Sequence, residues 1–241
     1  MLLHMRTRTD QVAASDGTFD VHLWFPDSGT GPGILLVQEI YGVGRYIEKV
    51  ALDLAGRGYV VAAPDLFWRL RPHWQGEHTP EGTAASIELA SGFDFVKGVV
   101  DCALTVAHLR SLSEVRGGVG ALGFCLGGSI DYTLAAEVEL DAVLSFYGSA
   151  VPDSTGLMER ITAPLLLVFG GSDPFIKRDR VAVVERAAEG RPNVVMHIEE
   201  AAGHAFHNSE APMFHNPEAA ERTWEVALGF LSEHLPVTLS R

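Results

Sequence analysis

The sequence of 241 residues is short of several features that would define a class of protein. Its two cysteines, Cys102 and Cys125, are too few for a disulfide framework. No uninterrupted apolar segment approaches the roughly 20 residues of a membrane span. The apolar run within residues 1–6 is also too short for a signal peptide. We therefore expect a cytoplasmic protein that does not associate with membranes.

Positive charge is also scarce. Lysine and arginine together number 18 against 31 aspartates and glutamates, which gives a formal net charge of −13. Such a protein repels nucleic acid and anionic lipid, so we expect neither as a partner. A small-molecule substrate remains open, because a local cationic pocket can exist on an acidic protein. The ten histidines show no His-Glu-x-x-His spacing, so we expect no metal site and no cofactor.

The sequence does contain a regular alternation of apolar runs and helix-like segments. Apolar or alternating runs typical of strands lie at 17–25, 34–37, 59–63, 119–122, 142–147, 164–169 and 194–198. Helical spacing is found at 47–54, from 126 onward, and near 176–189 and 218–234. This alternation predicts a mostly parallel central sheet flanked by helices on both faces, in a single α/β domain over 1–241. Residues 66–92 are irregular, and we expect them to form an excursion over the active-site edge.

One further helix is predicted before the central strand. Its apolar positions are Val96, Val99, Val100, Ala103, Leu104 and Ala107. Cys102 is expected on the apolar face of this helix, in the core.

The segment with the clearest chemistry is Gly123-Phe124-Cys125-Leu126-Gly127-Gly128. An apolar run precedes it and a helix-compatible segment follows, which predicts a strand, a tight turn and a helix with a nucleophile at the turn. Glycines suit a turn so sharp that a Cβ would collide with its neighbours. The start of the following helix would favour a thiolate at Cys125. The alternative is a glycine-rich turn that carries a buried structural cysteine.

Two strand ends downstream offer partners for Cys125. Asp173 follows the run 164–169, and His204 follows the run 194–198. The order nucleophile, acid, histidine is the one found in α/β-hydrolases. Each partner alone is weakly diagnostic, since Asp173 lies in a turn sequence and a single histidine is often structural. Together the three predict an α/β-hydrolase fold with a Cys125–His204–Asp173 triad.

An oxyanion hole can be predicted from the same pattern. One N–H group is expected from Leu126, the residue after the nucleophile. The other is expected from the loop after an earlier strand, where Ile40 is the best position.

These motifs resemble those of the dienelactone hydrolase (carboxymethylenebutenolidase) family over nearly the whole chain. The matching segments are Gln38-Glu39-Ile40-Tyr41-Gly42, Pro64-Asp65-Leu66, Gly123-Phe124-Cys125-Leu126-Gly127-Gly128, Tyr147-Gly148, Gly171-Ser172-Asp173 and Ala202-Gly203-His204-Ala205-Phe206. The resemblance implies that Cys125 attacks a lactone or ester carbonyl and that His204, oriented by Asp173, acts as acid and base. It also implies that Glu39 contacts the resting thiol and helps to ionise it. The alternative for Glu39 is an ion pair with Arg45 or another cation.

A cysteine nucleophile limits the substrates. A thiolate attacks carbonyl carbon readily but is itself a good leaving group, so a poor alkoxide leaving group would let the intermediate revert. An enolate or aryloxide departs easily. We therefore expect lactones and activated (enol or aryl) esters as substrates, cleaved through an acyl-cysteine intermediate.

The sequence departs from the family in its arginines. Members that act on dienelactone bind its carboxylate with one arginine shortly after the catalytic histidine and one before the long helix. Here residues 205–208 include no arginine, and none occurs between Arg71 and Arg110. Arg69, Arg71 or a protonated His207 could substitute, but a bidentate clamp is hard to build from these residues.

Four residues are expected to contact the substrate: Tyr41, Trp68, Phe206 and His207. Trp68, Phe206 and Trp74 would give an apolar pocket, or they could be ordinary core or loop packing.

The sequence thus predicts a monomeric cysteine hydrolase of the dienelactone hydrolase type with a small-molecule lactone or ester substrate. One alternative is a small-molecule binding protein with little or no turnover, which the missing arginines favour. A thiol redox protein is the other, but it lacks a resolving cysteine if Cys102 is buried.

Overall fold

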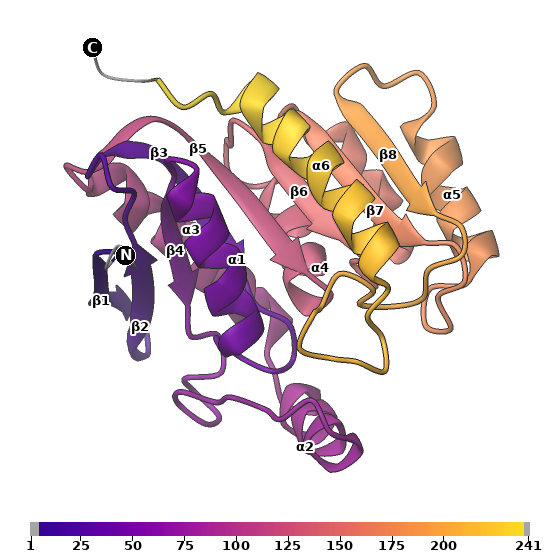
Figure 1. Ribbon diagram of the computed structural model, residues 1–241, viewed down its shortest axis with the longest axis horizontal. Helices are drawn as coiled ribbons and strands as arrows, with labels where there is room; N and C mark the ends of the chain where they lie inside the picture. The colour runs from indigo at the N-terminus through magenta and orange to yellow at the C-terminus, as the bar shows by residue number, and fades with distance from the viewer. Residues whose placement is uncertain (1–4, 239–241) are drawn as a thin grey trace.

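The computed structural model describes residues 5–238 and consists of one eight-stranded sheet with helices on both sides (Figure 1). The strands are β1 (Thr7–Ala14), β2 (Gly17–Trp24), β3 (Gly31–Val37), β4 (Val60–Pro64), β5 (Val115–Phe124), β6 (Val143–Phe146), β7 (Leu165–Gly170) and β8 (Val194–Glu199). The helices are α1 (Arg45–Gly56), α2 (Pro80–Ser91), α3 (Phe95–Ser111), α4 (Leu126–Leu134), α5 (Arg178–Ala188) and α6 (Pro217–His234), with short 3-10 helices at Val151–Asp153 and Thr155–Glu159. No signal peptide is expected in residues 1–6, and residues 1–4 of this segment lie outside the described residues.

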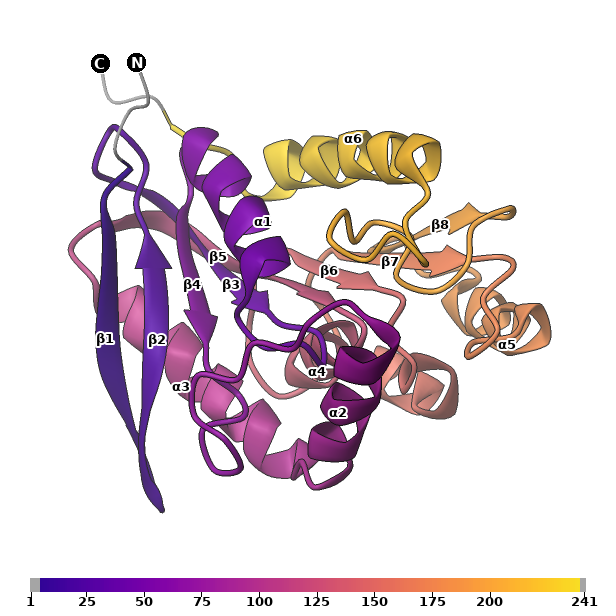
Figure 2. The ribbon, with the colours of Figure 1, turned by 60° about the horizontal axis from the view of Figure 1, so that its bottom comes forward.

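The sheet follows the order β1-β2-β4-β3-β5-β6-β7-β8. Pairing is antiparallel for β1 with β2 and for β2 with β4, and parallel across the other strands. Helices α1 and α6 cover one face, and α3, α4 and α5 cover the other (Figures 1 and 2). The central strands β3, β4, β6 and β7 are buried at every position, as expected of strands covered on both faces. The predicted α/β fold is confirmed, and no helix within residues 5–238 is long and apolar enough to cross a bilayer.

Strand β1 was not predicted from the sequence. It lies at the edge of the sheet and only Val12 is buried, so its sequence carries no apolar run or clear alternation. It pairs with β2 across the turn at Ser15 and Asp16. The edge strand therefore forms through its pairing with β2, and the hydropathy pattern of residues 7–14 alone does not reveal it.

The predicted irregular excursion at 66–92 is wrong for its second half, because residues 80–91 form α2. Only Ser86 of this helix is buried, so the helix has no apolar stripe to signal it. Its start is nevertheless encoded: the side chain of Thr79 accepts a hydrogen bond from the N–H of Gly82 at 3.0 Å, and Pro80 occupies the first turn. The excursion does lie over the carboxyl edge of the sheet (Figure 2).

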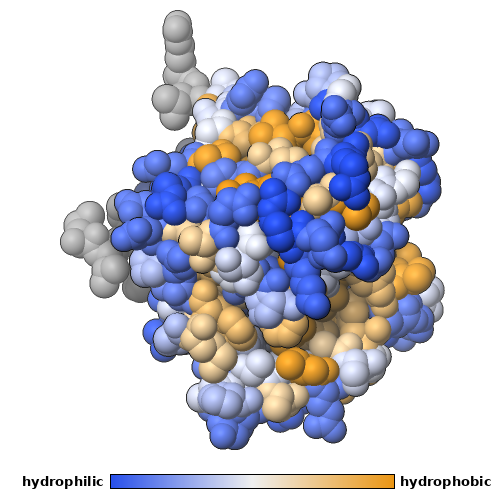
Figure 3. Space-filling model, turned by 90° about the vertical axis from the view of Figure 1, so that its right-hand side faces the viewer, coloured by the Kyte–Doolittle hydropathy of each residue, from blue (hydrophilic) through white to orange (hydrophobic). Residues whose placement is uncertain are grey.

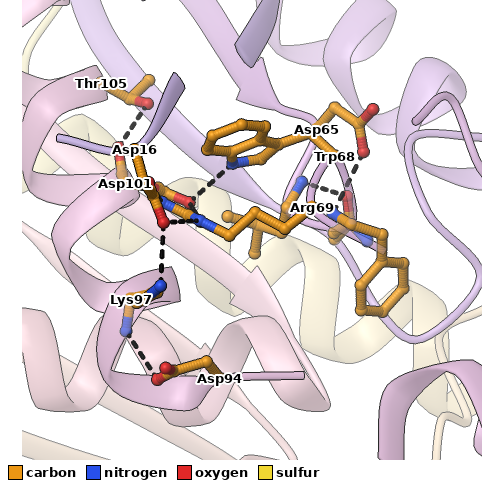
Figure 4. Close-up of polar contacts among 11 residues, drawn as sticks. Asp16, Asp65, Trp68, Arg69, Asp94, Lys97, Asp101 and Thr105 are labelled. Carbon is orange, nitrogen blue, oxygen red and sulfur yellow. Dashed lines mark hydrogen bonds and ion pairs between the residues drawn. The ribbon is translucent and has the colours of Figure 1, made fainter. Parts of the chain in front are cut away.

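Helix α3 is confirmed, but its buried face differs from the predicted one. Val96 and Val100 are exposed, whereas Cys102 is fully buried, as expected, beside the polar side chain of Asp101. Asp101 is buried because it accepts hydrogen bonds from the guanidinium of Arg69 at 3.0 Å and from the indole N–H of Trp68 at 3.0 Å (Figure 4). A paired carboxylate thus occupies a position where a hydropathy pattern expects an apolar residue.

Candidate active site

The turn between β5 and α4 holds Cys125 in a strained backbone conformation, with φ of 55° and ψ of −109°. A Cβ on Gly123 would lie 2.5 Å from the carbonyl oxygen of Gly127, and a Cβ on Gly127 would lie 2.3 Å from that of Val37. Both glycines are therefore required for the sharp turn, as the sequence predicted. The turn is held by the Cys125 N–H, which donates to the carbonyl of Phe146 at 2.9 Å. Positive φ at a non-glycine residue is typical of functional turns.

The three predicted triad residues lie in one hydrogen-bonded chain. Nε2 of His204 is 3.2 Å from Sγ of Cys125, and Nδ1 of His204 is 2.7 Å from Oδ2 of Asp173. The other oxygen of Asp173 accepts hydrogen bonds from the backbone N–H groups of Phe175 and Ile176 at 2.7 and 3.0 Å. The carboxylate is thereby fixed, and it holds the imidazole with Nε2 facing the sulfur.

The charges of this chain reinforce one another. Burial acts to lower the pKa of His204, but the adjacent Cys125 and Asp173 act in the opposite direction and raise it to about 10. For Asp173, burial acts to raise the pKa, but the hydrogen bond and charge of His204 and the N–H groups of Ile176 and Phe175 together outweigh it, so the pKa lies below its usual value. A His204 with a raised pKa, oriented by Asp173, can hold the proton that a nucleophilic thiol gives up.

Glu39 lies buried at the carboxyl end of β3, beside the triad. Its Oε2 accepts a hydrogen bond from the amide of Asn208 at 2.6 Å, and its Oε1 one from the hydroxyl of Tyr147 at 3.5 Å. Arg45 pairs instead with Glu210, so the alternative pairing of Glu39 with that arginine is not found. Burial raises the pKa of Glu39 to about 7, because the hydrogen bonds from Asn208 and Tyr147 and the charge of His204 offset it only in part.

The thiol of Cys125 faces His204 in this structure. The side-chain partners of Glu39 are Asn208 and Tyr147, and neither oxygen is hydrogen-bonded to the sulfur. Leu126 begins α4 directly after Cys125. Its N–H is one of the first in the helix, and these have no partner within the helix. Ile40 lies in the loop that follows β3 and lines the same cavity as Cys125.

A cavity of about 240 Å³ opens at this site. Its walls carry Glu39, Cys125 and His204 together with mostly apolar side chains: Ile40, Tyr41, Ile87, Phe175, Ala205 and Phe214, with Thr83 and Ser149. Two of these residues, Thr83 and Ile87, come from α2, so the excursion forms one wall. The Tyr41 hydroxyl and Oγ1 of Thr83 are 2.9 Å apart and join that wall to the loop after β3.

Of the four predicted substrate contacts, only Tyr41 is among the lining residues of this cavity. Trp68 packs against Phe19, with ring centroids 6.0 Å apart, and donates to Asp101. Phe206 is fully buried against Tyr147. Trp68 and Phe206 therefore pack against other side chains of the protein and do not line the cavity.

His207 lies on the other side of the loop from the cavity, under α1 and α6. Its Nδ1 is 2.7 Å from the hydroxyl of Tyr46, and its ring packs on Phe124 and Trp224. Burial lowers the pKa of His207 to about 4. His207 is therefore neutral at pH 7 and does not offer the cation that the sequence left open.

The two arginines considered as substitutes are also engaged elsewhere. Arg69 is bound between Asp16 and Asp101 (Figure 4), and the guanidinium of Arg71 lies over the ring of Trp74 at 4.7 Å. Among the described residues that line the cavity there is no lysine or arginine. The site thus has one titratable acid and one imidazole beside the thiol, within apolar walls.

Sequence reasoning missed Asn208 and the cavity walls from Thr83, Ile87, Phe175 and Phe214. Asn208 lies only four residues after His204, so a buried partner for Glu39 could have been sought in that segment. The wall residues carry no local signal, since they come from α2 and two loops.

An α/β-hydrolase fold with a cysteine, histidine and aspartate at the carboxyl edge of its sheet defines the class of protein. The pattern of the dienelactone hydrolase family matches residues 19–235, and the chain belongs to this family. It is 30% identical over 226 residues to a carboxymethylenebutenolidase from Pseudomonas sp., with 93% of this chain and 94% of that one covered.

Solved structures show the same fold. A dienelactone hydrolase from Anabaena variabilis superposes with a TM-score of 0.72 at 19% identity, covering 97% of this chain and 100% of that chain. A dienelactone hydrolase-like promiscuous phosphotriesterase from metagenomic libraries gives a TM-score of 0.80 at 21% identity, covering 95% and 98%. The predicted family and the enzyme class, a hydrolase of carboxylic ester or lactone bonds, are confirmed.

Proposed function

We propose that this protein hydrolyses an uncharged lactone or activated ester through an acyl-Cys125 intermediate. The observation that carries the proposal is the chain from Asp173 through His204 to Cys125, which ends at the wall of an apolar cavity. A nucleophile, a base within hydrogen-bond reach and an orienting carboxylate are the three groups that covalent catalysis requires.

The first half of the reaction forms the acyl-enzyme. The Cys125 sulfur, with its proton on Nε2 of His204, attacks the carbonyl carbon and a C–S bond forms. The N–H groups of Leu126 and Ile40 stabilise the negative charge on the carbonyl oxygen. The C–O bond to the leaving group then breaks, and the departing oxygen takes up the proton from His204.

The second half releases the acid. A water molecule gives a proton to Nε2 of His204 and attacks the thioester carbon. The tetrahedral intermediate again places its oxygen at Leu126 and Ile40, and it collapses by breaking the C–S bond. Asp173 keeps the imidazole oriented through both halves.

Glu39 is assigned a supporting role as a proton acceptor. With a pKa of about 7, it can take the thiol proton when the sulfur is turned away from His204. The resemblance to the family suggested this role, and the burial of Glu39 beside two neutral partners supports it.

The cavity walls favour an uncharged substrate. A carboxylate on the substrate would meet Glu39 and apolar side chains, with Arg69 and Arg71 engaged elsewhere. Burying a carboxylate without a cation carries a large desolvation cost.

The proposal is tested by hydrolysis of cis- and trans-dienelactone, an uncharged enol lactone and an aryl acetate by the protein and by Cys125→Ala. We expect turnover of the uncharged compounds, lost by at least about 10³-fold in the variant. Rapid Cys125-dependent turnover of dienelactone alone would refute the uncharged substrate, and turnover independent of Cys125 would refute the acyl-cysteine.

We also propose a monomer that works in the cytoplasm. Both cysteines are free, and Cys102 is buried in the core, where it cannot resolve an oxidised Cys125. A reducing compartment would keep the Cys125 thiol active. Light scattering after gel filtration should give the mass of a single chain, and a dimer mass would contradict the monomer.

A further inference from the structure

The mouth of the catalytic cavity carries large apolar side chains that are open to solvent. Ile87 is 56% exposed and Phe175 is 67% exposed. Both line the cavity, together with the half-buried Phe214. We call Ile87, Phe175 and Phe214 the apolar rim. Figure 3 shows apolar side chains gathered over the lower part of one face, at the height of α2 in Figure 1.

The apolar rim is assembled from three separate parts of the chain. Ile87 lies on α2 one turn after Thr83, so both face the cavity. Phe175 lies in the loop after β7, where its ring packs edge-on against His204 at 5.2 Å. Phe214 lies in the loop before α6. Large exposed apolar side chains that converge on one opening indicate a binding surface, whereas isolated ones are ordinary.

The volume of the cavity argues that a substrate reaches the rim. At about 240 Å³ it is smaller than the roughly 300–1,000 Å³ of pockets that enclose whole drug-sized ligands. At the roughly 30 Å³ that a water molecule takes up in the liquid, it holds on the order of eight groups of that size. A longer substrate must leave the cavity across the rim, where apolar atoms would be shielded from water.

The charge near the rim favours a chain without a carboxylate at its end. Helix α2 carries the exposed Glu81 and Glu88, with no lysine or arginine between Arg71 and Lys97, while the exposed Lys177 lies two residues after Phe175. An anionic terminus beside α2 would be repelled by the two carboxylates, although salt would weaken the repulsion.

We infer that the apolar rim binds an uncharged hydrocarbon chain on the acyl side of the substrate, so that the enzyme prefers medium-chain over acetyl esters. This inference rests on the proposed function, because it assigns the chemical class of substrate to the same site. Each methylene that fully leaves water is worth about 0.8 kcal/mol. A rim that stays half-open would give about half of that, which is roughly a twofold gain in kcat/KM per methylene.

The experiment compares 4-nitrophenyl acetate, butyrate and hexanoate at concentrations below micelle formation. The wild-type ratio of kcat/KM for hexanoate over acetate should be about 15, from four added methylenes. Ile87→Ser and Phe175→Ser should each lower this ratio at least about threefold. The matched control is Val100→Ser, since Val100 is 51% exposed on α3 and does not line the cavity; it should keep the wild-type ratio.

A second comparison tests the chain terminus. The 4-nitrophenyl monoester of adipic acid has the same six carbons as the hexanoate but ends in a carboxylate, and it should lose most of the gain over acetate. The inference would be overturned by a wild-type ratio of hexanoate to acetate at or below one, or by rim variants that keep the wild-type ratio. In either case, acetate hydrolysis that depends on Cys125 would still support the proposed function. Loss of Cys125 dependence for every ester would refute the proposed function, and the inference with it.

Discussion

The amide group of Asn208 donates a hydrogen bond to Oε2 of Glu39 at 2.6 Å, so the buried carboxyl group has a neutral partner. The orientation of the amide is set by its Oδ1, which accepts the N–H of Glu210 at 2.9 Å. Its Nδ2 also lies 3.2 Å from Nε2 of His78. With no ion pair to a lysine or arginine, the dominant influence on Glu39 is burial, which the charge of His204 offsets only in part, and the group is poised to gain or lose a proton near neutral pH.

We expect Glu39→Gln to remove an acidic limb from the pH profile of the enzyme. If the carboxylate accepts the thiol proton, kcat/KM of the wild type should fall as pH drops through about 7, the pKa of Glu39. The variant should be at least about tenfold slower at pH 8 and should lack that limb. Profiles of both proteins between pH 5 and 9 check this, with the exposed Glu88→Gln as the control. An unchanged limb in Glu39→Gln would show that another group titrates.

Asp173→Asn should lower kcat by about 10²–10⁴-fold with little change in KM. The amide cannot stabilise an imidazolium, and its N–H group can turn toward Nδ1 and favour the wrong tautomer of His204. Steady-state kinetics on an aryl acetate measure the loss. Asp179→Asn, at an exposed aspartate on α5, should retain wild-type kinetics. A loss confined to KM would mean that Asp173 acts in binding instead.

The cluster of Cys125, His204 and Asp173 could be predicted because each residue follows a strand of the parallel sheet within a few positions, so the fold itself brings the three together. The neighbours of the triad could not be predicted in the same way. Asn208 meets Glu39 across 169 positions of the chain, and that contact depends on how the loop after His204 packs. The buried face of α3 was predicted wrongly for a related reason. Asp101 on this helix is buried because its carboxylate pairs with Arg69, which lies in the excursion far along the chain. Local patterns register burial of apolar groups and miss burial of paired charges.

Arg69→Met should destabilise the protein without changing catalysis. Removing the guanidinium leaves the fully buried Asp101 without its cation, which typically costs about 3–5 kcal/mol when a buried pair is broken. Urea unfolding at pH 7 measures the change, and kcat/KM for an aryl acetate should stay within about twofold of wild type. The double variant Arg69→Met/Asp101→Leu should recover much of the lost stability. A selective rise in KM for carboxylate-bearing substrates in Arg69→Met would instead place Arg69 at the substrate.

The last prediction concerns Asp131 on α4, directly beneath the nucleophile turn. The side chain is fully buried, neither carboxyl oxygen has a hydrogen-bond partner among the described residues, and burial raises its pKa well above the usual value. Its folded pKa is raised, so its contribution to stability is fully present below the unfolded pKa of about 4 and is lost as pH rises toward the folded pKa.

Asp131→Asn keeps the shape of the side chain and removes the titration. The free energy of unfolding of the variant relative to wild type should therefore increase with pH, by up to about 1.4 kcal/mol per pH unit while folded Asp131 keeps its proton. Glu39 titrates in both proteins and cancels in the difference. Urea unfolding at pH 5, 6.5 and 8 gives the slope, and the exposed Asp27→Asn should show none. A difference that does not change with pH would mean that Asp131 is ionised in the folded protein, and that a partner for its charge lies beside the nucleophile turn.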